Sequence, residues 1–553
     1  MSERRSFLLV LALLAAQLVA FALLDRRPLN DHDPEFAGVA VQDAIQIQHA
    51  GSMGERLGVL GRRLFRHGER HPQLPQTLLA AWTGLTGWSR LHLRLSNLPW
   101  LLVLLVGTYL AARELATART ALLAMWLAGT LPLVIHMSRK WFPHLHAAAL
   151  APLALWLVLR LRDDARRQRW GPWLALGAVQ GLRLYTHPIG APDVAILYGL
   201  LALVLLAQVD GRAWIGRLLG AVAVTGLLAS PALFAGAVHE DGVGLAGYLA
   251  LVAHYLSADW ITSGRGWMET LARLGAGLGW AALPGAALVL LLGGARAPGV
   301  LRSDPWARLL GLRLALHVPA MVLTVGNDAF LADWLLLAPD VAILAALGLA
   351  RFGRGVVGLA VAQGAITLAL PLLLSLSQGA LVGSNGGLRA LFAHSEHGGA
   401  WNTHHLLVRT PAATTAIAEA LPPDTDVIGV IDLTFGAERC GMSAGAWVWE
   451  AAEPGFSALP GQDAFAEHWA RTPEWRLGAE RPAVIRVWAA GQDGGCTLGA
   501  DTAAPLVEQA RGVAERRFGE APTVVADPAQ LTLSAPRPSS EPVPGYAGAL
   551  LLR

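Results

Sequence analysis

The sequence predicts a polytopic α-helical membrane protein with a small α/β domain at its C-terminal end. Of its 553 residues, 54% are hydrophobic and 15% are charged, and the mean hydropathy is +0.45. That balance is typical of membrane proteins rather than soluble enzymes. Apolar runs long enough to cross a bilayer recur up to about residue 376, after which hydropathy falls. We therefore expect a membrane domain over residues 1–377 and a second domain over residues 378–553.

About eleven membrane spans are predicted from the apolar runs and the arginine-bearing gaps between them. Arg4 and Arg5 precede the first run and place the N-terminus in the cytoplasm. Each gap that is then cytoplasmic carries arginine, and an odd number of spans leaves the C-terminal domain outside. The predicted spans are residues 7–24, 93–112, 120–137, 145–161, 172–186, 190–208, 214–236, 270–293, 308–325, 333–350 and 355–376.

Two further apolar stretches are predicted to lie on the outer surface. Residues 76–90, within a long first outer loop over 25–92, are too short to span. Counting them as a span would also place the arginine-rich gap at 160–169 outside the cytoplasm. They are therefore expected to form an interfacial or re-entrant helix. Residues 245–261 carry apolar side chains at helical spacing and predict a helix lying on the outer surface.

The C-terminal segment alternates strand-like and helix-like stretches. Residues 426–433 and 482–489 are predicted strands, and residues 410–421 and 505–517 are predicted helices, which indicates a small α/β domain with a mixed sheet. Cys440 and Cys496 are the two cysteines of the chain, and both fall in this domain. In an oxidising compartment such a pair predicts a disulfide, with two unrelated buried thiols as the alternative.

An acidic cluster follows the first predicted span by a few residues. Asp31, Asp33 and Glu35 would lie on the outer face at the depth of the lipid head groups. Charged groups at membrane depth are functional candidates by default. A carboxylate there could accept a proton from an acceptor hydroxyl or amine, or a pair could hold a divalent cation such as Mg²⁺ or Mn²⁺ against a phosphate. The alternative is a solvated loop whose acids avoid the membrane.

Basic residues recur on the same predicted face. Arg139 and Lys140 form a dibasic pair in an outer loop, against the usual cytoplasmic bias, and Lys140 is the sole lysine of the chain. We interpret this pair as a phosphate-binding site. Glu69, Arg70 and His71 precede the interfacial helix, where a cationic pair also suits a phosphate, although a plain helix start explains them as well.

Histidines near these segments are candidates for metal binding or proton transfer. His144 follows the dibasic pair, and His187 lies where one predicted span breaks before the next begins. Neutral imidazole serves both roles, and broken helices at membrane depth usually line cavities. Glu69 is a third candidate ligand. Packing at the interface is the alternative for each histidine.

The order of these segments resembles the GT-C glycosyltransferases, in particular the branch of protein O-mannosyltransferases and of the aminoarabinose transferases that modify lipid A. His144 stands where members of that family often carry a second acid, and the first motif lacks the usual Asp-Glu pair. The resemblance extends over roughly residues 5–380. Its matching segments are residues 31–37, 71–74, 94–99, 138–139, 177–188 and 334–349.

The resemblance implies an enzyme of the bacterial inner membrane with a polyprenyl-phosphate-sugar donor and an active site in the outer leaflet. Transfer to a glycan, lipid or protein acceptor would invert the configuration at the anomeric carbon of the sugar, and an acid of the first loop would act as the base. Asp33 is the first candidate because Phe36 occupies the aromatic position that follows the family's acid, and Asp31 is the second. Surrounding membrane lipids are expected partners.

Two other functional classes are compatible with the composition, whereas nucleic-acid binding is not, because no basic run is present. A transporter or flippase of lipid-linked or small polar cargo would place charges inside its spans near the midplane. The predicted spans contain few acidic residues, which counts against that class. A non-catalytic scaffold that presents the C-terminal domain would leave the acidic cluster without a role.

Overall fold

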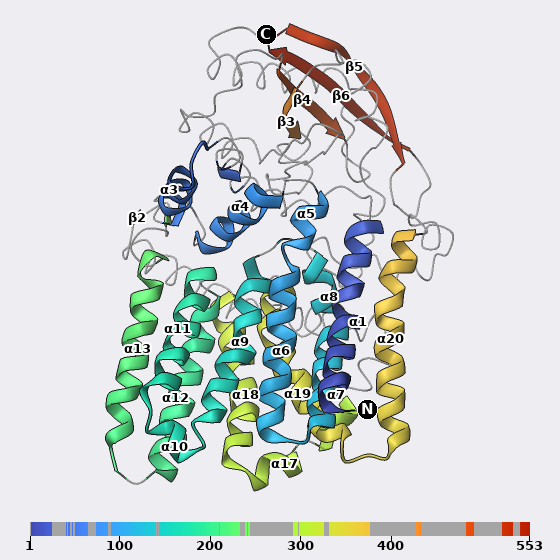
Figure 1. Cartoon of the computed structure of the whole chain (residues 1–553). Helices are drawn as coiled ribbons and strands as arrows, with labels where there is room; N and C mark the ends of the chain where they lie inside the picture. The colour runs from blue at the N-terminus through green and yellow to red at the C-terminus, as the bar shows by residue number, and fades with distance from the viewer. Residues whose placement is uncertain are drawn as a thin grey trace.

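The structure of the chain is a computed structural model and consists of a helical bundle with a four-stranded sheet at one end (Figure 1). The structure describes residues 2–24, 40, 43–44, 47, 50–64, 73–86, 90–139, 141, 143–187, 189–209, 211–232, 238–239, 242–243, 291–296, 298–325, 331–376, 426–432, 483–490, 523–534 and 542–552.

The first half of the described chain is helical. A long helix, α1, is followed by three short helices of the first loop and then by the helices of the bundle. Their bounds are α1 Glu3–Leu24, α3 Met53–Leu64, α4 Leu74–Thr86, α5 Arg90–Leu95, α6 Leu98–Leu115, α7 Ala118–Thr130, α8 Pro132–Arg139, α9 Pro143–Arg160, α10 Asp164–Arg167, α11 Trp170–Thr186, α12 Gly190–Gln208 and α13 Ala213–Pro231.

The second half adds helices to the bundle and then the sheet. A 3₁₀ helix, η4, leads directly into α19. The bounds are β1 Val238–His239, β2 Gly242–Val243, α17 Pro298–Ser303, α18 Pro305–Val325, η4 Leu331–Leu337, α19 Ala338–Leu349, α20 Arg354–Leu376, β3 Asp426–Asp432, β4 Ala483–Ala490, β5 Thr523–Ser534 and β6 Pro542–Leu552.

Four helices among the described residues are long and apolar enough to cross a membrane, and a fifth span results if α7 and α8 are counted together. The predicted spans 7–24, 145–161, 172–186, 190–208 and 355–376 coincide with α1, α9, α11, α12 and α20. Most of the predicted span 270–293 and the whole surface helix at 245–261 lie outside the described residues. The total of eleven spans therefore stays a prediction.

Three predicted spans are not continuous α-helices in the described part of the chain. The span at 93–112 is interrupted by a turn at Ser96 and Asn97, between α5 and α6. The span at 120–137 bends by 59° between α7 and α8. Leu131 has extended backbone angles there, because the ring of Pro132 disfavours the helical conformation of the residue before it. The span at 333–350 begins as η4 and becomes α-helical at Ala338. The short helix predicted at 76–90 is present as α4, which begins two residues earlier and ends before α5.

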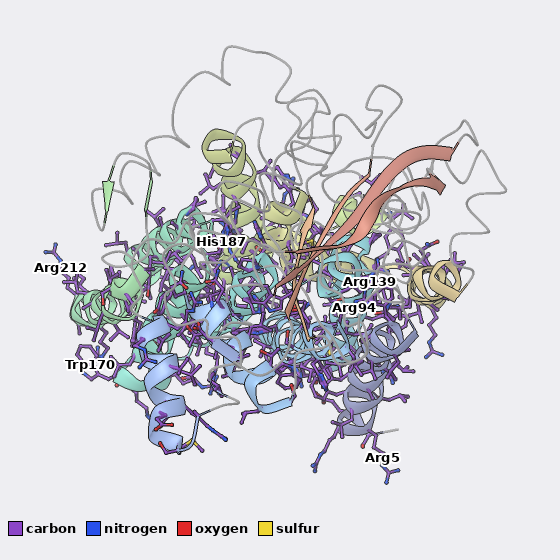
Figure 2. The ribbon with its side chains drawn as sticks, turned by 90° about the horizontal axis from the view of Figure 1, so that it is seen from above. Arg5, Arg94, Arg139, Trp170, His187 and Arg212 are labelled. Atoms are coloured by element: carbon purple, nitrogen blue, oxygen red, sulfur yellow. The ribbon has the colours of Figure 1, made fainter. Side chains whose placement is uncertain are left out.

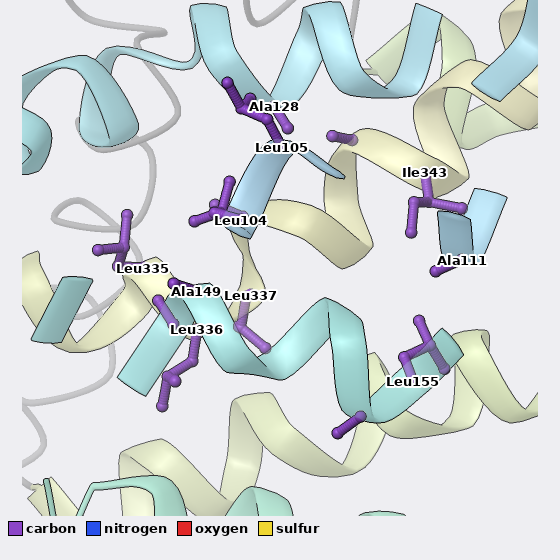
Figure 3. Packing of buried hydrophobic residues seen from close by; sticks show 14 of the residues in the cluster. Leu104, Leu105, Ala111, Ala128, Ala149, Leu155, Leu335, Leu336, Leu337 and Ile343 are labelled. Carbon is purple, nitrogen blue, oxygen red and sulfur yellow. The ribbon is translucent and has the colours of Figure 1, made fainter. Parts of the chain in front are cut away.

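The bundle is centred on α9, which packs between α6 and α11, while α7 packs against α19 and α12 against α18. Almost every residue of α9 is buried. Leucine and alanine dominate the contacts, so the helix backbones approach closely. Figure 3 shows part of this core, in which Leu104 and Leu105 of α6, Ala149 and Leu155 of α9, Leu336 and Leu337 of η4 and Ile343 of α19 are labelled.

The two ends of the bundle differ in their contacts. We call the end that bears α3, α4, α5 and the sheet the sheet end, and the end that bears the N-terminus, α10 and α17 the N-terminal end (Figure 1). Charged contacts join helix ends and the turns between helices at the N-terminal end. They are Arg113 with Glu3, Arg162 with Asp304, and Arg166 with Glu114, at 3.2, 2.9 and 3.8 Å.

The sheet has the order β3-β4-β6-β5. Strands β3 and β4 pair in parallel, whereas the β4–β6 and β5–β6 pairs are antiparallel. β3 and β4 lie at the predicted strands 426–433 and 482–489, and the sheet is mixed, as predicted. The two predicted helices of this segment lie outside the described residues, so the division into two domains and the α/β character of the second stay predictions.

Candidate active site

Two arginines meet over one aromatic ring near the end of α1. The Arg139 guanidinium lies 4.5 Å from the centre of the Phe21 ring, and the Arg94 guanidinium lies 5.5 Å from it. Figure 2, seen from the sheet end, shows Arg94 and Arg139 next to each other. An arginine over an aromatic face gains a cation–π attraction that strengthens when water is excluded, and Phe21 is buried. Two cations are thus held beside the last turn of α1.

A hydrogen bond across the bundle fixes the segment that carries Arg139. The Asn97 side chain donates from Nδ2 to the backbone oxygen of Ser138 at 3.1 Å. The Ser138 hydroxyl and the Arg139 Nε both donate to the carbonyl of Ile135, at 2.9 and 3.1 Å. Such bonds satisfy carbonyls that the end of a helix leaves without backbone partners. The predicted motif segments 94–99 and 138–139 are therefore in direct contact.

The two candidate histidines lie against each other. The rings of His144, at the start of α9, and His187, between α11 and α12, have centres 4.2 Å apart with a tilt of 38°. Both are buried, at 5% and 8% exposure. The backbone N–H of Ile189 donates to His187 Nδ1 at 3.2 Å, so the neutral ring carries its proton on Nε2. The sequence named both residues but gave no sign that they touch.

His146, two residues after His144 in α9, packs among aromatic side chains. Its ring meets Trp100 edge-on at 4.7 Å and lies 5.6 Å from Trp141, centre to centre. This residue is fully enclosed among aromatic side chains, and such edge contacts stabilise a core.

The helices of the first loop are tied to the bundle by buried polar contacts. Arg63, in α3, forms an ion pair with Asp43 and donates to Gln73 Oε1 at 3.1 Å. Gln73 belongs to the predicted motif 71–74. The Tyr185 hydroxyl, near the end of α11, donates to the carbonyl of Leu64. Through these bonds α3 and the start of α4 are fixed close to the segment that carries His187.

Most of the predicted site residues lie outside the described residues and stay predictions. Arg139, His144 and His187 are described, and the first lies over Phe21 while the other two form a pair. Within the described part of the chain, no group of three or more His, Cys, Asp or Glu side chains is arranged to hold a metal ion. The predicted residues outside the description are Asp31, Asp33, Glu35, Glu69, Arg70, His71, Lys140, Cys440 and Cys496.

Sequence reasoning missed a buried ionic network inside the bundle. Asp193 in the first turn of α12 accepts from Arg183 of α11, from Arg313 of α18 at 2.7 and 2.8 Å, and from His317 Nδ1 at 3.1 Å. Arg313 also donates to Asp340 of α19 at 2.9 Å. All five side chains are at most 1% exposed.

The signal for this network was present in the sequence. Asp193 is the single acid of the predicted span 190–208, and Arg183 is the single arginine of the span 172–186. Asp340 and Arg313 lie inside the spans 333–350 and 308–325, whose other acid and arginine stand at the first residue of each span. Intramembrane charges of opposite sign usually pair with one another. The scarcity of acids in the predicted spans therefore does not by itself exclude a transporter, because Asp193 and Asp340 are buried inside the bundle and paired with arginines.

Comparison with known proteins rests on structure, since neither family models nor curated protein sequences gave a match to the chain. The crystal structure of ArnT from Cupriavidus metallidurans bound to undecaprenyl phosphate is similar to this chain with a TM-score of 0.52. The two share 16% sequence identity, and the match covers 98% of this chain and 97% of that one. The fold is that of the GT-C glycosyltransferases.

More distant matches have lower scores. The oligosaccharyltransferase AglB from Archaeoglobus fulgidus, in complex with an inhibitory peptide and a dolichol-phosphate, matches 77% of this chain and 62% of its own, at 14% identity and a TM-score of 0.42. The arabinofuranosyltransferase AftD from Mycobacteria matches 99% and 40% respectively, at 15% identity and a TM-score of 0.45. The GT-C fold identified from the sequence is thus confirmed through ArnT, over nearly the whole chain.

Proposed function

We propose that this protein is a membrane glycosyltransferase that moves a sugar from a polyprenyl-phosphate carrier to an acceptor on the extracytoplasmic side. The fold supports the class of enzyme, and the ArnT structure with this fold holds undecaprenyl phosphate. That lipid carries a single phosphate on a long apolar chain, a chemistry that suits a helical bundle with cations at one end. The acceptor would be a glycan, a lipid or a protein.

The observation that carries the proposal is that two arginines lie beside the last turn of α1 at the sheet end, close to where the acidic cluster begins. Arg94 and Arg139 lie over Phe21, and α1 ends three residues later at Leu24. From there the chain reaches Asp31 in seven residues, at most about 25 Å when extended. The acids of the first loop are thus tethered within reach of Arg94, which is buried, and of Arg139, which is partly buried. A carboxylate and a phosphate-binding cation pair are the two groups that inverting transfer from a lipid phosphate requires.

The proposed reaction is a single displacement. Asp33, or Asp31 in its place, takes the proton of the acceptor hydroxyl or amine as that atom attacks the anomeric carbon. The bond from this carbon to the phosphate oxygen breaks, and the lipid phosphate leaves with the electron pair. The configuration at the anomeric carbon is inverted. Arg139 and Lys140, with Arg70 and His71 of the first loop, balance the growing charge on the departing phosphate. Glu35 is the third acid of the cluster.

The histidine pair would supply a neutral hydrogen-bonding group at the end of α11, apart from Arg94 and Arg139 (Figure 2). His187 carries its ring proton on Nε2 and is enclosed with His144. A donor of this kind can orient a phosphate or an acceptor without adding a charge. Glu69, Mg²⁺ and Mn²⁺ remain candidates from the sequence alone, and no step of the proposed reaction passes through a metal.

The decisive experiment supplies radiolabelled undecaprenyl-phosphate sugars, one at a time, to the purified full-length protein with membrane extract as the source of acceptor. We expect label to move from the lipid to acceptor with wild-type protein and with Lys140→Arg. Asp33→Asn should abolish transfer while it leaves thermal unfolding and undecaprenyl-phosphate binding unchanged, because removal of a base affects the chemical step. Full activity in both Asp33→Asn and Asp31→Asn would reject the base assignment.

The buried network favours one alternative enough to test. Ionisable groups inside spans also occur along the substrate pathways of transporters. In that case, vesicles that contain the protein would flip fluorescent undecaprenyl phosphate without any sugar transfer. Transfer of label to acceptor, with a flipping rate equal to that of protein-free vesicles, would exclude this class.

A further inference from the structure

The network sits directly behind the turn that carries His187. Arg183 is one helical turn before His187 in α11, and its carbonyl accepts the N–H of His187 at 3.2 Å and the Thr186 hydroxyl at 2.6 Å. The N–H of Gly190 then donates to the carbonyl of His187 at 3.1 Å. These bonds make a tight corner between α11 and α12, with the His187 ring at its apex.

The corner is closed by an ion pair between its two arms. The Arg183 guanidinium reaches across to Asp193, ten residues later in the chain, and it also donates to Gln180 Oε1 at 2.8 Å. Asp193 lies in the first turn of α12, where a negative charge is stabilised by the helix dipole. The pair thus sets the angle and the spacing of the two helix ends from which His187 projects.

A second pair anchors the corner to the rest of the bundle. Arg313 contacts both oxygens of Asp193 and also Asp340, so α18 and α19 are linked to α12 through one guanidinium. The network contains two arginines and two aspartates, and His317 also contacts Asp193. Removal of one charge alone would leave its partner buried and uncompensated, which damages folding, whereas removal of one charge of each sign keeps the balance.

We propose that Arg183 and Asp193 are positioning residues that act through His187, so that this ion pair sets where the His187 ring stands at the candidate site. The inference rests on the proposed function. A residue misplaced by about 1 Å can cost on the order of 100-fold in rate, even when the misplacement originates away from the chemistry. The ring of His187 is held on one side by His144, so movement of the corner would break that stacking as well.

The test compares two variants that each remove one positive and one negative charge. Arg183→Met/Asp193→Asn opens the corner, whereas Arg313→Met/Asp340→Asn leaves the corner pair intact. Both full-length proteins are purified in detergent, and thermal unfolding, undecaprenyl-phosphate affinity and sugar transfer are measured. We expect both variants to fold. Transfer or affinity should fall at least about 10-fold in the corner variant, the scale of a misplaced contact, and less than about 3-fold in the control.

A double-mutant cycle separates positioning from a merely structural role. His187→Ala should lower transfer or affinity, and the corner variant should add no further loss in the His187→Ala background, because residues that act through one group are not additive. Additive losses, equal losses in the two charge-balanced variants, or no effect of His187→Ala would each overturn the inference. Should the corner variant not fold, Asp193→Glu, which keeps the charge but lengthens the side chain, replaces it in the same cycle.

The two proposals fail in different ways. Wild-type protein that transfers sugar while the corner variant matches its control would leave the proposed function standing and remove the positioning role. Wild-type protein that neither transfers sugar nor binds undecaprenyl phosphate would remove both.

Discussion

The Arg139 guanidinium stacks on the Phe21 ring at 4.5 Å, which joins the end of the third predicted span to the last turn of the first. Phe21 lies in the helix that runs into the acidic cluster, and Arg139 lies in the segment held by Asn97. This contact brings a phosphate-binding candidate to the part of the fold from which the candidate base extends. It is the physical link between two motifs that are separated by more than a hundred residues in the sequence.

Loss of the Arg139 side chain should weaken donor binding. Arg139→Ala is expected to reduce the affinity for undecaprenyl phosphate by about 1.5–3 kcal/mol, the scale of a hydrogen bond to a charged group. Arg139→Lys should lose less affinity, because lysine keeps the positive charge. Some loss should remain, because lysine lacks the planar guanidinium that binds two oxygens at once. Lys140→Ala should weaken binding on the same scale. The measurement is binding of fluorescent undecaprenyl phosphate to protein in detergent.

Arg212→Ala is the matched control for charge, because Arg212 is exposed at the start of α13, far from Arg139 in Figure 2. Equal losses in Arg139→Ala and Arg212→Ala would show a non-specific charge effect. Unchanged affinity in the Arg139→Ala/Lys140→Ala double variant would move the phosphate site to Arg70 and His71.

Close packing of α11 on α13 should make Gly177 sensitive to a single methyl group. A Cβ at Gly177 would collide with the carbonyl oxygen of Ala221, and the Thr225 hydroxyl donates to the Gly177 carbonyl at 3.1 Å. Gly177→Ala is expected to destabilise the protein by about 1–3 kcal/mol, because overpacking pushes the helices apart. Gly226→Ala in α13 meets open space and should leave stability unchanged or raise it by up to about 1 kcal/mol.

Thermal unfolding in detergent compares the two variants. A drop that is the same for Gly177→Ala and Gly226→Ala would contradict the close approach of α11 and α13. A drop confined to Gly177→Ala would support it, and Gly181→Ala should then behave alike, since its added Cβ would lie 2.9 Å from the Thr225 carbonyl oxygen.

The sequence predicts the positions of helices better than it predicts contacts between side chains that are far apart in the chain. Apolar runs identified α1, α9, α11, α12 and α20 because hydropathy depends on local composition. The break at Leu131 was missed, although Pro132 supplied a local signal. The contact between Asp193 and Arg313 was out of reach, because 120 residues separate the two and only the packing of α12 on α18 brings them together.

The candidate site shows the same division. Residue type and membrane depth were sufficient to name Arg139, His144 and His187. Their geometry needed the fold, since the His144–His187 stacking depends on how α9 lies against α11. The sequence therefore names chemical groups, and the helix packing decides which of them meet.

The positive-inside pattern makes a prediction about orientation. The N-terminus, α10 and α17 share one end of the bundle, and α3, α4 and the sheet share the other (Figure 1). A reporter fused at Arg166, in α10, should be active in the cytoplasm, and one fused after residue 380 should be active outside it. Alkaline phosphatase and green fluorescent protein fusions give opposite readouts and serve as mutual controls. Reversed signals would place the candidate site on the cytoplasmic face and remove the proposed reaction.

The last prediction concerns Cys440 and Cys496, both outside the described residues. If the C-terminal segment is extracytoplasmic, it lies in an oxidising compartment, and an even pair of cysteines there most simply forms a disulfide. The bond would close a loop of about 55 residues and stabilise the segment by roughly 4 kcal/mol in the chain-entropy model. Mass spectrometry of alkylated protein before and after reduction measures it, with the cysteine-free Cys440→Ser/Cys496→Ser variant as control. Two cysteines alkylated without reduction would refute the bond and would also count against an extracytoplasmic C-terminal segment.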